Sequence, residues 1–404
     1  MFHPRKILSL FTRLTDHTGI ILISVFLNFA GFTLIIPVLP FSVARYVAKP
    51  DIAFWVSLIL AIYALCSFVA APVLGAMSDR YGRRPILILS LCGSAIGFAV
   101  FGIGGALWVL VLGRIIEGLT AGSISAMYAY VADVYSPAER GPAFGMLGVA
   151  GGLGFMLGPV LGGLLGQMSL SAPLYGATVL ALLNVVLVRC YMPESHPPEK
   201  RSIRLNWNQF NAIGQLIRSL RNQHLRLLFV VVFCFAFGSV VLQSNLVVLL
   251  KDRLAFTPSL VGFVLTSIGV MDIVSQGLVA TRLLPRFGER RVASAGLLIN
   301  GLGLALLAFL AAYPVLPLLI CAIALLTFGD GLFQPSVSAM IAGAAPAGRQ
   351  GEVQGANQAQ QSIARMFGPL ASAWLYGIFA GAPYAVAAII VFLAAGVLWV
   401  RSSE

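Results

Sequence analysis

The sequence predicts an all-α integral membrane protein in which twelve transmembrane helices form two pseudo-symmetric six-helix bundles. Three observations favour this fold: the composition, the distribution of basic residues and an internal repeat. Of the 404 residues, 59% are hydrophobic and only 10% are charged, which is too little charge to cover the surface of a soluble domain. Because a spanning helix needs about 20 apolar residues, the chain is long enough for about twelve.

The basic residues are unevenly distributed between the loops. Most of the 26 Lys and Arg residues fall in every second loop, and only Arg45, Lys49, Lys251 and Arg253 fall in the loops between. Cytoplasmic loops of membrane proteins carry such an excess of basic residues. We therefore expect a multi-pass membrane protein with both termini in the cytoplasm, and the absence of N-x-S/T from the sequence favours the cell inner membrane. The net charge of +12 then reflects topology, with the lipid bilayer and no nucleic acid as partner.

The chain divides by composition into four parts. Residues 1–19 form a basic cytoplasmic segment, 20–191 an N-terminal six-helix bundle, 192–225 a polar cytoplasmic linker and 226–404 a C-terminal six-helix bundle. Within the linker, 207–220 is predicted as an amphipathic helix on the membrane surface. The apolar segments that predict the twelve helices are 20–43, 53–77, 85–104, 106–134, 141–166, 173–191, 226–250, 258–281, 291–312, 315–342, 351–379 and 383–400.

The two predicted bundles repeat each other. The charged stretch Arg80–Arg84 returns as Arg286–Arg290, and Glu117–Leu119 returns as Asp330–Leu332, followed in both copies by Ser-Ala-Met. Parallel six-helix repeats around a site near the membrane midplane are an architecture of secondary transporters. The repeat therefore favours a transporter, and it places Glu117 and Asp330 at equivalent positions.

The stretch Gly75–Pro85 carries one acid and three arginines between two apolar runs. Gly82 permits a tight turn, Pro85 suits the first turn of the next helix, and Asp79 can pair with the arginines. The spacing G-x-x-S-D-R-x-G-R-R-P resembles the loop between helices 2 and 3 of the major facilitator superfamily. In that family the loop contacts the inner end of helix 4 and latches the cytoplasmic side. The resemblance implies a gating latch of Gly75, Asp79, Arg80, Gly82, Arg83, Arg84, Asp133 and Arg140.

An alternative is that these charges only fix the orientation of the chain in the membrane. The repeated copy has Pro285 where the first copy has Asp79. We therefore expect the latch to be stronger in the N-terminal half.

Small residues recur in the segment 141–166. Their spacing lets helices pack closely, and a proline among them permits a bend. The string G-x-x-x-G-P-x-x-G-G resembles the helix 5 motif of drug:proton antiporters such as the twelve-helix tetracycline exporters, with helix packing alone as the alternative. The residues of this motif are Gly154, Gly158, Pro159, Gly162 and Gly163.

Ionisable residues inside the predicted spans are Arg114, Glu117, Asp272, Asp330 and Arg365. A charge at membrane depth costs several kcal/mol, so such residues are paired, protonated or functional. Arg114 and Glu117 are three residues apart on one helix face and can form an ion pair. Glu117, Asp330 and Asp272 are the candidates for proton coupling, with structural ion pairs as the alternative.

Further polar residues at membrane depth are candidates for the substrate cavity, together with Arg114 and Arg365. They either bind substrate or hydrogen-bond one helix to another. They are Asn28, Gln243, Asn245, Asn300, Gln334, Asn357 and Gln361.

The chain departs from the tetracycline exporters at several of their intramembrane acids. Where that family carries aspartates in helices 1, 9 and 3, this chain aligns Asn28, Asn300 and Gly97. Where it carries a histidine in helix 8, this chain aligns Asp272. The carboxylates associated with metal–tetracycline binding are therefore missing, which leaves export of another amphiphile.

These features predict a secondary active transporter that exports small amphipathic drugs or metabolites by alternating access, in exchange for protons. We expect a monomer powered by the proton gradient, with no cofactor and no metal site. The alternative is a symporter or facilitator that imports a sugar, an organic acid or a siderophore-like nutrient, with Arg114 and Arg365 receiving an anionic substrate. We predict no enzyme, because H-E-x-x-H, G-x-S-x-G and G-x-x-x-x-G-K-[ST] do not occur in the sequence.

Overall fold

The computed structural model describes residues 18–135, 140–196, 223–344 and 350–400, and over these ranges the chain is almost entirely helical, without strands. The all-α prediction is therefore confirmed. The predicted surface helix 207–220 and nearly all of the basic segment 1–19 lie outside the described residues. The chain forms two compact units: the first contains Met1–Ser42, Ile62–Trp207 and Pro258–Phe263, and the second contains Val43–Ala61, Asn208–Thr257 and Val264–Glu404.

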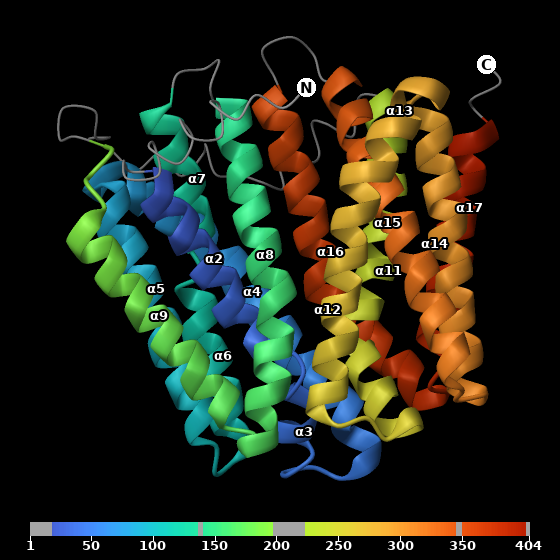
Figure 1. Ribbon diagram of the computed structural model, residues 1–404, viewed down its shortest axis with the longest axis horizontal. Coiled ribbons are helices and arrows are strands. Elements are labelled where there is room, and N and C mark those ends of the chain that lie inside the picture. Colours follow the sequence, from blue (N-terminus) through green and yellow to red (C-terminus); the bar gives the residue numbers. More distant parts are fainter. Residues whose placement is uncertain (1–17, 136–139, 197–222, 345–349, 401–404) are drawn as a thin grey trace. The chain divides into compact units, whose positions relative to one another are not determined.

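The first unit is built around α2, which packs against α8 and α9. Figure 1 labels these helices. In chain order the elements of the N-terminal half are α2 (Thr18–Leu34), α3 (Leu39–Val43), the 3₁₀-helix η1 (Lys49–Asp51), α4 (Ile52–Tyr81), α5 (Arg83–Ile103), α6 (Leu107–Leu119), α7 (Ser123–Val134), α8 (Arg140–Met168) and α9 (Ala172–Tyr191). Of these, η1 and the first turns of α4 fall in the second unit.

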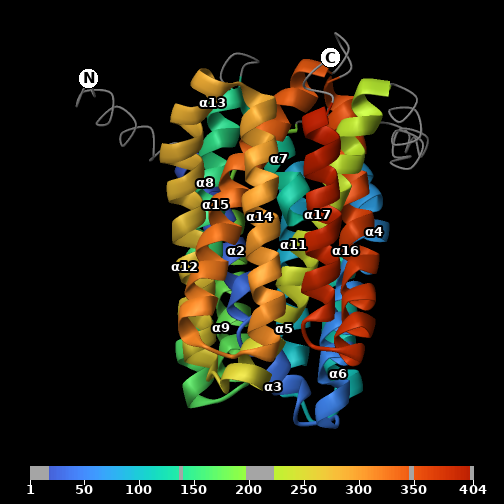
Figure 2. The ribbon, with the colours of Figure 1, turned by 90° about the vertical axis from the view of Figure 1, so that its right-hand side faces the viewer.

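The second unit is built around α14, which packs against α15 and α17. Figure 2 shows α14 between these two helices. The elements of the C-terminal half are α11 (Gln223–Leu254), α12 (Pro258–Val274), the π-helical turn η4 (Ser275–Ala280), α13 (Thr281–Phe287), α14 (Glu289–Ala312), α15 (Leu316–Ala344), α16 (Gln350–Ile378) and α17 (Ala382–Val400).

Within the described residues, 10 helical segments are long and apolar enough to cross a membrane. The other two predicted segments, 20–43 and 351–379, each contain a helix as well. In the first, α2 is apolar but only 17 residues long, because the helix ends before Pro37. In the second, α16 has 29 residues, but its first half is rich in Gln and Asn.

The predicted loop Gly75–Pro85 is mostly helical, which corrects the expected loop length. α4 continues through Gly75 and Asp79 to Tyr81, and α5 begins at Arg83. Only Gly82 separates the two helices. Its φ of 106° is a left-handed conformation that favours glycine. A single residue makes the turn because the polar residues after Gly75 extend α4 beyond its apolar part.

Two predicted segments are interrupted next to candidate acids. The segment 106–134 contains α6 and α7, which separate after Glu117 at Thr120–Gly122. The segment 258–281 contains α12 and then η4, which begins just after Asp272. π-Helical turns occur often at functional sites. The position of η4 therefore favours a functional role for the nearby Asp272.

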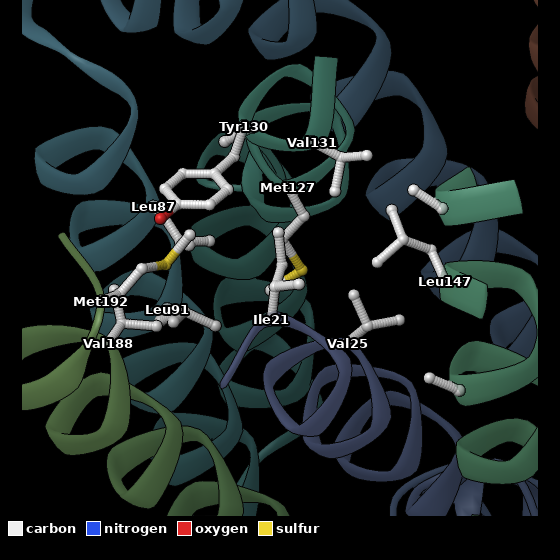
Figure 3. Packing of buried hydrophobic residues seen from close by; sticks show 13 residues of the cluster. Ile21, Val25, Leu87, Leu91, Met127, Tyr130, Val131, Leu147, Val188 and Met192 are labelled. Atoms are coloured by element: carbon white, nitrogen blue, oxygen red, sulfur yellow. The ribbon is translucent and has the colours of Figure 1, made fainter. Parts of the chain in front are cut away.

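A buried apolar cluster joins α2, α5, α7, α8 and α9 (Figure 3). Its labelled members are Ile21, Val25, Leu87, Leu91, Met127, Tyr130, Val131, Leu147, Val188 and Met192. Met192 follows the end of α9, yet it is only 2% exposed. The chain is therefore held against the bundle beyond its last helix in this half.

We predict that Gly82→Ala lowers the free energy of unfolding by about 1 kcal/mol, because alanine pays a steric penalty at this positive φ. Thermal unfolding of the purified protein in detergent measures the change. Gly152→Ala is the matched control, since Gly152 lies within α8 with open space where a Cβ would stand, and we expect it to be neutral or slightly stabilising. Equal effects of the two substitutions would contradict the conclusion that the turn between α4 and α5 requires glycine at position 82.

Candidate functional site

Arg83 lies at the centre of an ion-pair relay at the start of α5. Its Nη1 donates to Asp79 Oδ1 at 2.5 Å, and its Nε donates to Asp133 Oδ2 at 2.9 Å. Nη1 also donates to Ser78 Oγ at 3.3 Å. The Arg83 side chain is only 11% exposed, so water screens these pairs less than it screens surface pairs. The relay joins the ends of α4, α5 and α7, as a latch in this half requires.

The other arginines of the predicted latch do not join the relay. Arg80 is exposed, and its guanidinium lies over the Tyr81 ring at 5.4 Å from the centroid. Arg84 donates to the carbonyl of Arg189. Arg140 begins α8, and its side chain lies outside the described part of the chain.

Glu194 belongs to this site, and sequence reasoning missed it by assigning it to the polar linker. Its Oε1 accepts a hydrogen bond from the backbone N–H of Arg83 at 2.9 Å, and its Oε2 accepts one from Arg84 at 3.2 Å. The first N–H groups of a helix have no acceptor within the helix. Gly82, the N-cap residue of α5, has no side chain that could accept these hydrogen bonds. In the sequence, this glycine is the only indication that the acceptor must come from another segment.

The glycines of the α8 motif stand at close helix contacts. A Cβ at Gly154, Gly158 or Gly162 would meet the backbone of α2, and Thr33 of α2 donates to the Gly154 carbonyl at 3.3 Å. Gly163 faces Pro258 and Ser259 of the same unit, while Pro159 lies inside α8. The motif therefore brings α8 against α2 at backbone distance, which agrees with the packing interpretation.

Arg114 and Glu117 form a buried ion pair on α6. Arg114 Nη1 donates to Glu117 Oε2 at 2.7 Å, and the two side chains are only 4% and 5% exposed. The Arg114 guanidinium also lies 5.2 Å from the centroid of the Phe101 ring and 5.9 Å from that of Tyr63. The predicted pairing is therefore present. Each partner balances the charge of the other, so both can stay ionised in apolar surroundings.

The equivalent acid of the second half, Asp330, has a different environment. Ser275 of η4 donates to the Thr327 carbonyl at 3.2 Å, and its side chain faces Gly331. These contacts pack η4 closely against α15 beside Asp330. In this arrangement η4, which begins three residues after Asp272, lies against the part of α15 that carries Asp330. The structure therefore brings the two candidate acids of the second half together.

Neither of these aspartates has a cationic partner in the described residues. Asp272 Oδ2 accepts a hydrogen bond from Gln276 at 2.9 Å. The Oδ1 atoms of both aspartates are buried and lack a hydrogen-bond partner within the described ranges. Neighbouring carboxylates that each bury one oxygen and have no cation beside them are costly when both are ionised. This arrangement is suited to holding a proton.

Three of the seven predicted cavity amides connect helices. Asn28 donates to Ser123 Oγ at 3.0 Å, Asn245 to Ser372 Oγ at 2.6 Å, and Asn300 to the Leu326 carbonyl at 3.2 Å. Asn357 accepts from Gln360 within α16 at 3.0 Å. Gln243, Gln334 and Arg365 are exposed, and Gln361 is half-buried. These contacts favour a structural role for Asn28, Asn245 and Asn300.

The chain is similar to known transporters over nearly its whole length. A sequence profile described as Major Facilitator Superfamily matches residues 21–248 and 228–404. Tetracycline resistance protein, class C, of Escherichia coli is 34% identical over 361 residues, which are 88% of this chain and 89% of that protein. Multidrug resistance protein 2 of Bacillus subtilis (strain 168) is 28% identical over 384 residues, 94% of each chain.

A solved structure has the same fold. The crystal structure of the human organic anion transporter MFSD10 matches with a TM-score of 0.70 and 26% sequence identity. The match covers 95% of this chain and 98% of that chain.

We predict opposite stability effects for the two acids that the repeat makes equivalent. Glu117→Gln leaves the Arg114 charge buried without its partner, and we expect a loss of about 3 kcal/mol in the free energy of unfolding. Asp330→Asn removes no ion pair, and we expect it to be neutral or stabilising. Thermal unfolding in detergent compares the variants, and equal destabilisation by both would contradict the assigned environments.

Proposed function

The chain belongs to the Major Facilitator Superfamily, a family of membrane transporters and not of enzymes, and from this membership we propose that it exports small amphipathic drugs or metabolites in exchange for protons. The protein acts as a multi-pass monomer in the cell inner membrane, with both termini in the cytoplasm. It uses the proton gradient and no cofactor. Relatives named for tetracycline resistance and multidrug resistance support a role in efflux and antibiotic resistance.

The observation that carries the proposal is the neighbouring pair of Asp272 and Asp330. With both carboxylates ionised, the buried oxygens would repel each other without a cation to balance them. One proton held by the pair removes this cost and supplies a hydrogen-bond donor. In the exchange cycle, the pair takes up a proton from the outer side and releases it to the cytoplasm when the substrate binds.

Alternating access couples these steps. A proton or a substrate shifts the balance of inward-open and outward-open states only by its differential affinity for the two. Export in exchange for protons requires that the deprotonated state prefers substrate and the protonated state releases it.

Glu117 takes a supporting role in this proposal. Its carboxylate is already neutralised by Arg114 at 2.7 Å, so protonation would leave the arginine charge uncompensated. The pair Arg114–Glu117 therefore keeps the first half rigid, while Asp272 and Asp330 exchange the proton. Glu117 and Asp330 are equivalent in the repeat, but only Glu117 has a cationic partner in the described residues.

Tetracycline is not the proposed cargo. The acids that the tetracycline exporters carry in helices 1, 9 and 3 are absent here. Asn28 and Asn300 stand at two of these positions and are engaged in hydrogen bonds to neighbouring helices. An amphipathic molecule that needs no chelated metal fits these residues better.

Import of an organic acid or another nutrient is the second candidate function. The similarity to MFSD10, which is described as an organic anion transporter, favours an organic anion as substrate, and an arginine would have to receive it. Arg114 is engaged with Glu117, which argues against that residue as the receptor. Growth on sole carbon or iron sources, with and without the gene, separates import from export.

We predict that Asp330→Asn and Asp272→Asn each lower proton-driven dye uptake into inverted membrane vesicles by about tenfold or more. Ethidium is the probe, and an imposed pH gradient, acidic inside, is the driving force.

The matched control is Glu289→Gln, which changes an exposed acid at the first residue of α14 and should leave uptake unchanged. Full proton-driven uptake by both aspartate variants would refute the proposed coupling site. A wild-type protein that drives no uptake of any amphipathic dye would refute export itself.

A further inference from the structure

We propose that Glu194 is a positioning residue of the cytoplasmic latch, and that the segment Met192–His196 fixes the relay of Arg83 and its two aspartates. This inference concerns the gating of the export proposed above, and its contacts lie wholly within the first unit. The segment follows α9, where the sequence predicts the start of a linker. Its side chains instead reach the ends of α5 and α7.

The first contact is to the backbone of α5. The two carboxylate oxygens of Glu194 accept hydrogen bonds from the backbone N–H groups of Arg83 and Arg84, at 2.9 and 3.2 Å. A carboxylate at a helix N-terminus satisfies orphan donors and is favoured by the helix dipole. The backbone of Arg83 is thus held by Glu194 while its guanidinium is held by Asp79 and Asp133. Both ends of the same residue are fixed.

The second contact is to α7. Ser195 Oγ donates to Asp133 Oδ2 at 3.3 Å, and His196 Nδ1 lies 3.6 Å from the same oxygen. Asp133 Oδ2 is also the acceptor for Arg83 Nε. The segment therefore contacts the relay at two places: Glu194 at the start of α5, and Ser195 and His196 at the end of α7.

The third contact anchors the segment. Met192 is only 2% exposed and packs in the cluster with Val188, Leu87 and Tyr130, as Figure 3 shows. Glu194 also binds the backbone N–H of His196 at 3.0 Å, which closes a tight turn. Because Met192 is buried, Glu194, two residues later in the chain, is held next to the first turn of α5. A residue in a freely moving linker would not be held there.

The repeated copy in the second half lacks this arrangement. Gly288 has the matching positive φ, 79°, and as the N-cap residue of α14 it has no side chain that could cap the helix. Pro285 replaces Asp79, and Glu289 replaces Arg83. Arg290 instead donates to the carbonyl of Leu398 at 3.0 Å. The described part of the second half thus keeps the turn without the relay.

Amide hydrogen exchange of the full-length protein in detergent tests the inference. In Glu194→Ala, we expect exchange of the first turn of α5 to rise about tenfold, the loss typical of a removed N-cap. Exchange at the last turn of α7 should rise as well, although Glu194 makes no hydrogen bond there. A purely local cap would leave α7 unchanged, and that result would overturn the positioning role.

Two further variants sharpen the test. Glu194→Gln keeps an acceptor and should restore part of the protection, whereas Glu289→Ala in the second half should change neither turn. Asp133→Asn should raise exchange at the same two turns, and combining it with Glu194→Ala should add little, because both act on one relay. Independent, fully additive effects would overturn the inference.

Transport supplies the last readout. In the vesicle assay, Glu194→Ala should lower the maximal rate of ethidium uptake about fivefold and leave KM within about twofold, because it alters gating and not binding. An unchanged maximal rate would overturn the gating role. The exchange measurements need no substrate, so failure of the proposed export would leave them valid.

Discussion

An ionised side chain in hydrocarbon needs either a partner or a proton, and this constraint explains the acids of both halves. In the first half Arg114 supplies the partner, at 2.7 Å from Glu117. In the second half the described residues supply Asp330 with no cation, and neither Asp330 Oδ1 nor Asp272 Oδ1 has a hydrogen-bond partner there. We propose that the same constraint gives an ion pair in one repeat and a proton-holding pair in the other.

The halves differ in a second respect, at the turn between the second and third helices of each repeat. In the first half, Gly82 makes the turn and Arg83, Asp79, Asp133 and Glu194 hold its ends together. In the second half, Gly288 makes an equivalent turn, but Pro285 has replaced the acid. The two halves thus keep one backbone arrangement, and we propose that the first copy serves gating and the second serves proton exchange.

The sequence predicted what depends on local pattern. Apolar length predicted the helices, the repeat predicted that Glu117 and Asp330 are equivalent, and a three-residue spacing predicted the pair of Arg114 and Glu117. It did not predict Glu194 as a member of the latch, because its contact to Arg83 spans 111 residues. Such contacts depend on how the helix ends pack, and no local pattern encodes that.

The remaining errors also have physical causes. The sequence predicts a loop over Gly75–Pro85 because its charges lie between two apolar runs, whereas in the structure these polar residues continue α4 to Tyr81. Asn28, Asn245 and Asn300 were candidates for substrate binding, but an amide at membrane depth can satisfy its donors on a neighbouring helix. Side-chain type alone does not distinguish these uses.

Infrared spectroscopy of the reconstituted protein at neutral pH tests the central claim most directly, because a protonated carboxyl group has its own absorption band and no substrate is needed. The account predicts such a band in the wild-type protein. It predicts that Asp330→Asn and Asp272→Asn each remove the band and that Glu117→Gln keeps it. A wild-type protein without the band, or its loss in Glu117→Gln alone, would contradict the account.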